Sequence, residues 1–257
     1  MEVSDSTVVV TGATRGIGAA VTRLLVAEGA HVVGCARDEG ALADLAAGID
    51  GGDQSADGDG SDGDGADDGN GGNAGGTLTT VRADVRDEYD VERLLETASR
   101  AGTSPGVDAV VACAGVSHGT PGEMPLGEES YSAFDDTLRT NVRGVFATVR
   151  EALPHMDGDG RVLVPSGSVA REAAAGMGAY AVSKAAAEAV VRGFAVDAEP
   201  AVGIVDPGLV ATALTGGDRG RDPGDVAPMF LWALRELDAD ELNAEVVDLR
   251  TWRTATR

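Results

Sequence analysis

From its seventh residue the chain reads Thr7-Val8-Val9-Val10-Thr11-Gly12-Ala13-Thr14-Arg15-Gly16-Ile17-Gly18. The β-branched residues 7–11 predict a buried strand, and the apolar spacing of residues 17–28 predicts a helix. The glycines between them permit a tight turn and let a pyrophosphate approach the backbone, while the helix N-terminus supplies N–H donors and a positive dipole. The spacing Gly-x-x-x-Gly-x-Gly differs from the Gly-x-Gly-x-x-Gly fingerprint, so the dinucleotide-binding prediction depends on the position of the turn between strand and helix.

Short strand-like and longer helix-like segments alternate along the rest of the chain. Further strands are predicted at residues 31–36, 77–83, 107–112, 161–164, 202–205 and 245–249, and further helices at 39–47, 88–101, 131–153, 179–198 and 223–237. Such alternation is typical of an α/β fold whose parallel sheet is covered on both faces. We therefore expect residues 1–257 to form a single domain, a Rossmann-like doubly wound parallel sheet with helices on both faces.

Residues 51–76 interrupt the alternation. They are almost wholly Gly, Asp, Asn, Ser and Ala, with no apolar residue larger than alanine. Such a segment buries too little surface to offset the entropy lost on ordering, so we expect a disordered acidic insertion. Cation binding is the alternative, because Asp57, Asp59, Asp62 and Asp64 are rich in oxygen ligands. The segment lacks the twelve-residue spacing ending in glutamate that a specific calcium loop requires.

The composition is strongly acidic, with a formal net charge of −23 and a sequence pI of about 4.3. This charge disfavours binding to nucleic acid or to an anionic membrane surface. The acidic excess, the low aromatic content and the presence of a single lysine resemble proteins of extreme halophiles, and we expect the fold to need high salt. The acidic start and the absence of any apolar stretch of membrane-spanning length predict a cytoplasmic protein.

The cysteines and histidines do not predict a metal site. Cys35 and Cys113 each fall in an apolar run predicted as a buried strand, and two isolated thiols form neither a disulfide framework nor a metal cluster. The histidines, His31, His118 and His155, show no metal-ligand spacing, so we assign them to the surface or to loops.

Lys184 follows Tyr180 by four residues inside a predicted helix. Residues four apart share one helix face, so the phenol and the ammonium are expected to point into the same space. A nearby cation favours the ionised phenol, which would let Tyr180 exchange protons at physiological pH. The alternative is an ordinary exposed helix pair, and the rest of the sequence decides between the two.

The glycine turn and the Tyr180-x-x-x-Lys184 pair together resemble the short-chain dehydrogenase/reductase family. Four further matches follow in order along the chain, and the resemblance runs from Thr7 to about Leu249. Asp84-Val85 resembles the pair that contacts adenine, and Ala114-Gly115 the end of the family's Asn-Asn-Ala-Gly motif. Asn141 resembles the helix asparagine of the proton relay, and Pro207-Gly208 followed by Thr212 resembles the segment that holds the nicotinamide amide.

The resemblance implies two sets of site residues. The catalytic set is Tyr180, Lys184, Ser168 and Asn141. The cofactor-binding set is Thr11, Gly12, Arg15, Gly16, Ile17, Gly18, Arg37, Asp84, Val85, Ala114, Gly115, Lys184, Pro207, Gly208, Val210 and Thr212. No metal is implied.

Two positions depart from the family pattern. Cys113 stands where the second asparagine of Asn-Asn-Ala-Gly is usual, and we expect altered strand hydrogen bonding there without loss of function. The family's catalytic serine most often lies thirteen residues before the tyrosine, and that position is Gly167. We select Ser168, because Gly167-Ser168-Val169-Ala170 resembles the family's Ser-Val-Ala run, and Ser166 remains the alternative.

The end of the second strand indicates the cofactor preference. Enzymes that prefer NAD place a carboxylate there to bind the ribose 2′-hydroxyl. The corresponding residue is Ala36, followed by Arg37, and Arg15 in the glycine turn is a second cation. Because guanidinium groups match phosphate geometry, we expect NADP(H) to be preferred over NAD(H). In the alternative, Arg37 faces solvent and Asp38 reaches the ribose.

The predicted function is that of an NAD(P)-dependent oxidoreductase of the carbonyl reductase or alcohol dehydrogenase type. Tyr180 would act as general acid or base, with Ser168 on the substrate oxygen. The alternative is a non-catalytic dinucleotide-binding sensor or scaffold, favoured by Cys113 and the displaced serine; a dehydratase or epimerase is less expected. The partner is a small carbonyl or alcohol bound by residues 116–130 and 211–221, whose identity the sequence does not indicate. The resemblance also implies a homodimer or homotetramer.

Overall fold

The computed structural model describes residues 1–51, 75–217 and 219–257. The insertion predicted at residues 51–76 falls almost entirely outside the described residues, so its predicted disorder and the alternative of cation binding stay predictions. None of the described helices is both long enough and apolar enough to cross a membrane.

Within the described residues the strands form a seven-stranded sheet in which every neighbouring pair is parallel. The strands are β1 (Thr7–Thr11), β2 (His31–Ala36), β3 (Thr77–Arg82), β4 (Ala109–Ala112), β5 (Arg161–Pro165), β6 (Ala201–Asp206) and β7 (Val246–Asp248). Their order across the sheet is β3-β2-β1-β4-β5-β6-β7. The order reverses between β1 and β4, which is where ligands bind in open sheets of this kind. The predicted Rossmann-like fold is confirmed.

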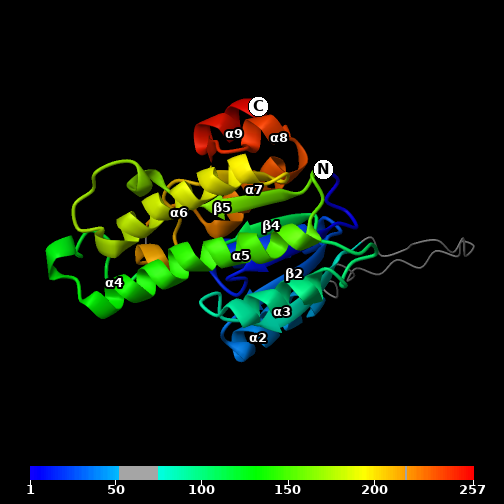
Figure 1. The fold of residues 1–257 in the computed structure, drawn as a ribbon, viewed down its shortest axis with the longest axis horizontal. Coiled ribbons are helices and arrows are strands. Elements are labelled where there is room, and N and C mark those ends of the chain that lie inside the picture. Colours follow the sequence, from blue (N-terminus) through cyan, green and yellow to red (C-terminus); the bar gives the residue numbers. More distant parts are fainter. Residues whose placement is uncertain (52–74, 218) are drawn as a thin grey trace, which may run out of the picture.

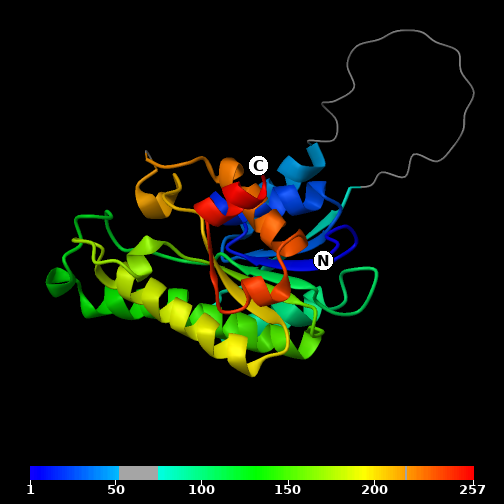
Figure 2. The ribbon, with the colours of Figure 1, turned by 90° about the horizontal axis from the view of Figure 1, so that it is seen from above.

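The helices form one layer on each face of the sheet, as the two ribbon views show (Figures 1 and 2). The first layer holds α1 (Gly16–Ala27), α2 (Glu39–Asp50) and α7 (Pro223–Arg235). The second holds α3 (Glu88–Ala98), α5 (Gly144–Ala152) and α6 (Gly178–Asp197), with α4 (Tyr131–Leu138) ahead of α5. Two short helices, α8 (Ala239–Leu242) and α9 (Leu249–Ala255), flank β7.

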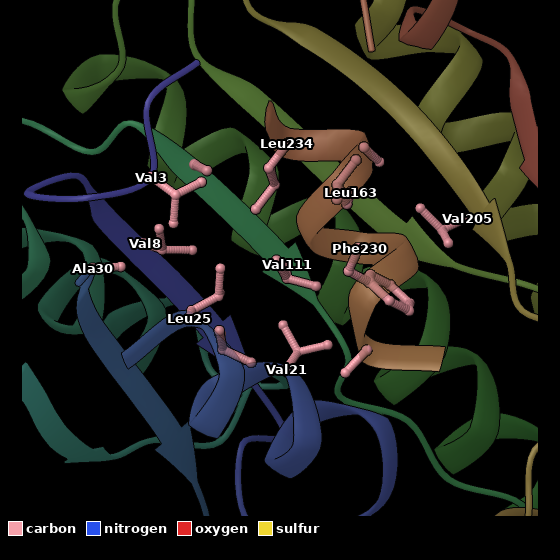
Figure 3. Close-up of a cluster of buried hydrophobic side chains, with 14 of the residues drawn as sticks. Val3, Val8, Val21, Leu25, Ala30, Val111, Leu163, Val205, Phe230 and Leu234 are labelled. Carbon is pink, nitrogen blue, oxygen red and sulfur yellow. The ribbon is translucent and has the colours of Figure 1, made fainter. Parts of the chain in front are cut away.

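Alternate residues of each strand supply the two cores. Val8 and Val10 of β1 belong to the cluster beneath α1 and α7, whereas Val9 belongs to the cluster beneath α3, α5 and α6. Figure 3 shows the first cluster, in which Leu25 and Phe230 approach the sheet from the two helices. Burying each large side chain of this kind contributes roughly 1.5–3 kcal/mol, so the cluster gives the sheet a rigid base.

The structure differs from the predicted elements at two places. The helix predicted at 131–153 is interrupted by a π-helical turn, η3 (Arg139–Arg143), which separates α4 from α5. The helices α8 and α9 were not predicted, because elements of four and seven residues show too few periods for a pattern. The other predicted strands and helices are present with small shifts at their ends.

Candidate cofactor and catalytic site

A cavity of about 500 Å³ lies at the carboxyl ends of the strands, at the reversal of strand order. Most predicted site residues line it. These are Gly12, Arg15, Gly16, Ile17, Gly18, Arg37, Asp84, Val85, Ala114, Gly115, Tyr180, Lys184, Pro207, Gly208, Val210 and Thr212. Thr11, Asn141 and Ser168 are not among its lining residues.

The turn after β1 has the geometry of an anion cradle. Gly12 has φ +65° and Gly16 φ +54°, a conformation that residues with a side chain rarely adopt. A Cβ on Gly18 would lie 2.2 Å from the Gly12 carbonyl oxygen, so only glycine fits. The N-cap residue of α1, Arg15, makes no side-chain capping bond, which leaves the first-turn N–H groups to an anion. These features fit the pyrophosphate of a dinucleotide.

Thr11 supports this turn from behind. It is fully buried, and its hydroxyl accepts a hydrogen bond of 3.1 Å from the backbone N–H of Ala114. The bond joins the turn after β1 to the turn after β4, so Thr11 sets the width of the cavity at the strand reversal without lining it.

Arg37 and Asp38 follow β2 and both line the cavity. The Asp38 carboxylate caps α2, accepting a hydrogen bond of 3.2 Å from the N–H of Ala41. Arg15, in the glycine turn, lines the same cavity. Two arginines and one helix-capping aspartate therefore contribute to the lining of one cavity.

Asp84, after β3, is held by Arg86. Nε and NH2 of Arg86 donate to the Asp84 carboxylate at 3.0 and 2.6 Å. Burial would raise the pKa of Asp84, but the hydrogen bonds and charge of Arg86 hold it below its ordinary value. Arg86 also donates to Asp136 at 2.6 Å, and Asp136 pairs with His118 at 2.9 Å. The carboxylate next to the expected adenine position is thus ionised and fixed in place.

Tyr180 and Lys184 share one face of α6, as predicted, and both line the cavity. Lys184 Nζ lies 5.7 Å from the centre of the Tyr180 ring and donates a hydrogen bond of 2.9 Å to the Pro165 carbonyl oxygen. The carboxyl end of β5 therefore holds the ammonium between the phenol and the sheet. This arrangement excludes an ordinary exposed helix pair.

Asn141 sits in the π-helical turn and is only 2% exposed. Its Oδ1 accepts a 2.8 Å bond from the N–H of Val116, and its Nδ2 donates to the Val116 carbonyl and to Ser183 Oγ, both at 2.9 Å. The side chain therefore joins the loop after β4 to α6. A π-turn changes the register of backbone hydrogen bonding, and such turns are frequent at functional sites.

The two candidate serines differ in their surroundings. Ser166 lines the cavity, and its hydroxyl donates a 2.7 Å bond to Oε1 of the buried Glu188. Ser168 begins the short helix η5 (Ser168–Ala170) and is exposed. The Ser166 proton is therefore committed to a carboxylate, whereas the side chain of Ser168 is open to solvent.

Cys113 lies one residue beyond β4, not within a strand as predicted, and it is half-buried in the cavity lining. A Cβ on Gly18 would come within 3.3 Å of the Cys113 Cβ, so a small side chain suits the approach of α1. Burial raises the pKa of the Cys113 thiol to about 12, and the charge of Lys184 opposes this only in part. The thiol is neutral at physiological pH.

Sequence reasoning missed three charged residues beside the cavity. Arg171 forms an ion pair with Glu188 and another with Asp206, and the two carboxylates are buried. Glu188 follows Lys184 by four residues, so the periodicity that paired Tyr180 with Lys184 could have indicated it. Among the described residues, no group of three or more His, Cys, Asp and Glu side chains is placed to hold a metal ion.

Two family models match the chain. A model described as short chain dehydrogenase matches residues 6–62, and one described as Enoyl-(Acyl carrier protein) reductase matches residues 70–227. Together they include the glycine turn and the helix that carries Tyr180 and Lys184.

Several curated relatives span the chain. Glycine betaine reductase ATRR of Emericella nidulans is 30% identical over 96% of this chain, which spans only 19% of that protein's length. L-fucose dehydrogenase of Mus musculus is 31% identical over 82% of this chain and 67% of its own. An uncharacterized oxidoreductase of Staphylococcus saprophyticus is 27% identical over 92% of this chain and 94% of its own.

Solved structures agree with the fold. A dehydrogenase/reductase from Sinorhizobium meliloti superposes with a TM-score of 0.77 at 25% identity, covering 96% of this chain and 95% of its own. A short chain dehydrogenase from Burkholderia cenocepacia, solved in complex with NADP, superposes with a TM-score of 0.78 at 24% identity, covering 96% and 97%. Fold, motifs and relatives agree that the chain belongs to the short-chain dehydrogenase/reductase family of oxidoreductases.

Proposed function

We propose that this protein is an NADP(H)-dependent carbonyl reductase that also runs in reverse as an alcohol dehydrogenase. The observation that carries the proposal is the position of Tyr180 and Lys184, which face the same cavity as the glycine turn. A proton donor and a dinucleotide cradle in one cavity are the two parts that carbonyl reduction requires.

When bound in this cavity, NADPH would supply the hydride that adds to the carbonyl carbon of the substrate. Tyr180 donates a proton to the substrate oxygen as it becomes an alkoxide, and accepts that proton back in the oxidative direction. Lys184 gives one of its three N–H donors to Pro165. The ammonium would also hold the nicotinamide ribose, and it keeps positive charge near the Tyr180 phenol. Asn141 and its π-turn hold a water that returns protons from solvent.

Ser168 donates a hydrogen bond to the substrate oxygen and stabilises its developing charge. The exposure of Ser168 and the bond from Ser166 to Glu188 support this assignment. If Ser166, and not Ser168, binds the substrate oxygen, Ser166→Ala abolishes turnover while Ser168→Ala leaves turnover unchanged.

Arg15 and Arg37 bind the 2′-phosphate of NADP(H). Both line the cavity, and Asp38 caps α2 at its edge. A carboxylate that accepts from a helix N–H competes less well for a ribose hydroxyl, which favours the phosphate. The relative from Burkholderia cenocepacia was solved with NADP, which supports the same preference.

Subunits pair through α5 and α6, giving a homodimer or homotetramer. Phe146 of α5 stacks on Phe194 of α6 with ring centroids 5.7 Å apart, and Phe146 remains 43% exposed. The two helices lie side by side in Figure 1. An exposed aromatic of this kind is stabilised when a second copy covers it.

The direct experiment follows NADPH absorbance in multimolar KCl with ketones, aldehydes, quinones and 3-oxoacyl thioesters, with NADH in parallel. Turnover with NADPH preferred over NADH is expected. Equal use of both cofactors would refute the role of Arg15 and Arg37 and favour Asp38 on the ribose. NADPH binding without turnover of any substrate would favour the second candidate, a dinucleotide-binding sensor. That candidate is supported by the distance from Ser168 to Tyr180, which is one residue shorter than the family's usual separation of serine and tyrosine.

A further inference from the structure

Three charged side chains that the proposed mechanism does not use meet beside the cavity. Arg171 follows the η5 turn, Glu188 lies on α6, and Asp206 ends β6. Glu188 is 2% exposed and Asp206 7% exposed, so both carboxylates lie away from water. Buried carboxylates of this kind need a cation to offset their desolvation, and Arg171 bridges the two.

Each carboxylate also holds a different part of the cavity. Glu188 Oε1 accepts the 2.7 Å bond from Ser166 and lies 3.5 Å from NH1 of Arg171. Asp206 Oδ1 accepts a 3.0 Å bond from the N–H of Gly208, while its Oδ2 binds NH2 of Arg171. The guanidinium therefore connects the turn after β5 with the turn after β6.

Arg171 is also tied to the candidate catalytic serine through the backbone. The N–H groups of Arg171 and Glu172 both donate to the Ser168 carbonyl oxygen, at 2.9 and 2.8 Å. The position of Ser168 therefore depends on where residues 171 and 172 are held. The guanidinium is the group of Arg171 that fixes this end of the turn to α6 and β6.

We propose that Arg171 is a positioning residue that sets the distance between the Ser168 turn and the Pro207-Gly208 turn. This inference rests on the proposed function, in which one turn binds the substrate oxygen and the other the nicotinamide. Guanidinium geometry suits the task, because its rigid fork binds two carboxylates at once, whereas an ammonium is a point charge. A catalytic group displaced by about 1 Å commonly loses about 10²-fold in rate.

Arg192 provides a matched control. It lies on α6 and approaches the other oxygen of Glu188, with NH1 3.9 Å from Oε2. Its side chain is 54% exposed, and no ion pair joins it to Asp206 among the described residues. Removing Arg192 therefore takes a cation from Glu188 without separating the two turns.

The test compares Arg171→Met, Arg171→Lys and Arg192→Met in multimolar KCl. The readouts are the NADPH dissociation constant from fluorescence, kcat and KM separately, and melting temperature. Arg171→Met is expected to lower kcat about 10²-fold and weaken NADPH binding about 10-fold. Arg171→Lys recovers only part of the loss, because one ammonium cannot bridge both carboxylates. Arg192→Met stays within about twofold of the wild type in kcat and NADPH binding.

A double variant tests whether Arg171 acts through Asp206. Asp206→Asn keeps an oxygen for the Gly208 N–H but removes the charge that Arg171 pairs with. If the two act as a unit, Arg171→Met with Asp206→Asn loses no more NADPH affinity than Arg171→Met alone. Losses that multiply would overturn the proposal.

Two other results would overturn it: NADPH affinity and kcat within about twofold of wild type in Arg171→Met, or an equal loss in Arg192→Met. If Arg171→Met does not fold, a folded Arg171→Lys with wild-type NADPH affinity would also refute the role. A wild-type protein that binds NADPH but turns over no substrate would refute the proposed function, while the NADPH dissociation constants would still decide the role of Arg171.

Discussion

Two arginines, one at the start of β5 and one after the η5 turn that follows the strand, have opposite surroundings. Arg161, the first residue of the strand, donates to the carbonyl oxygens of Ala233 and Leu237 at the end of α7. Arg171, beyond the last residue, bridges two carboxylates beside the cavity. One cation completes a helix end, and the other connects two turns of the candidate site.

The difference follows from the direction of the chain. In a parallel sheet with helical crossovers, the helix N-termini follow the carboxyl ends of the strands, and the helix C-termini lie at the amino ends. The carboxyl edge therefore presents positive helix ends that suit phosphates. The amino edge presents carbonyl groups that suit cations, which explains Arg161. We expect substitutions at the carboxyl edge to change catalysis and those at the amino edge to change stability.

The largest expected effect is at the carboxyl edge. Tyr180→Phe removes the proton donor but keeps the ring beside Lys184. Turnover is expected to fall about 10³-fold, while NADPH binding and melting temperature stay near wild type. Stopped assays with the best substrate, together with fluorescence titration, measure both. Strong residual turnover would reject Tyr180 as the proton donor.

A smaller effect, on stability alone, is expected at the amino edge. Arg161→Met leaves the Ala233 and Leu237 carbonyls without their donor, which costs about 2 kcal/mol in the free energy of unfolding. Burial already lowers the pKa of Arg161, so part of the loss is offset when its charge is removed. Denaturant unfolding in KCl measures the loss.

The exposed Arg235, near the same helix end, is the control for Arg161. It pairs with Glu28 at 3.1 Å and is 41% exposed, so Arg235→Met should change stability by less than about 1 kcal/mol. A change in kcat for Arg161→Met at unchanged NADPH affinity would contradict the division between the two edges.

The smallest expected effect is on the stability of the fold as the pH is lowered. Burial opposes the ionisation of both Asp84 and Asp136. Hydrogen bonds from Arg86 nevertheless hold the pKa of Asp84 below its ordinary value, and hydrogen bonds from His118 and Arg86 do the same for Asp136. Groups with a lowered folded-state pKa stabilise the fold above their unfolded pKa of about 3.9 and lose this contribution as pH falls below it. Arg86→Met should therefore cost about 1 kcal/mol in the free energy of unfolding near neutral pH, and the difference from wild type should shrink as the pH falls below the unfolded pKa.

The experiment measures the free energy of unfolding of the wild type and of Arg86→Met at a series of pH values, starting at about pH 7 and moving to lower pH. Arg100→Met is the control, because Arg100 is 74% exposed and 3.7 Å from Glu96. A difference for Arg86→Met that grows as the pH falls would show that the pair does not stabilise the folded state.

Much of the site could be predicted because its chemistry is carried by short runs. The glycine turn, Asp84-Val85, Ala114-Gly115 and Pro207-Gly208 each combine one backbone conformation with one position after a strand, and all line the cavity. The Tyr180 and Lys184 pair depends only on helical periodicity. The choice between Ser166 and Ser168 could not be made in this way, because it depends on where Glu188 lies.

Local pattern determined the strands, the long helices, the glycine turn and the shared face of Tyr180 and Lys184, because each depends on residues within a few positions of one another. The tertiary structure alone decided which polar groups meet. Asn141 bonds Val116 and Ser183, 25 and 42 residues away, and Arg171 bonds Asp206, 35 residues away. Such contacts follow from the order of strands in the sheet, which brings distant loops to one edge, and a buried polar group then takes the partner that lies there.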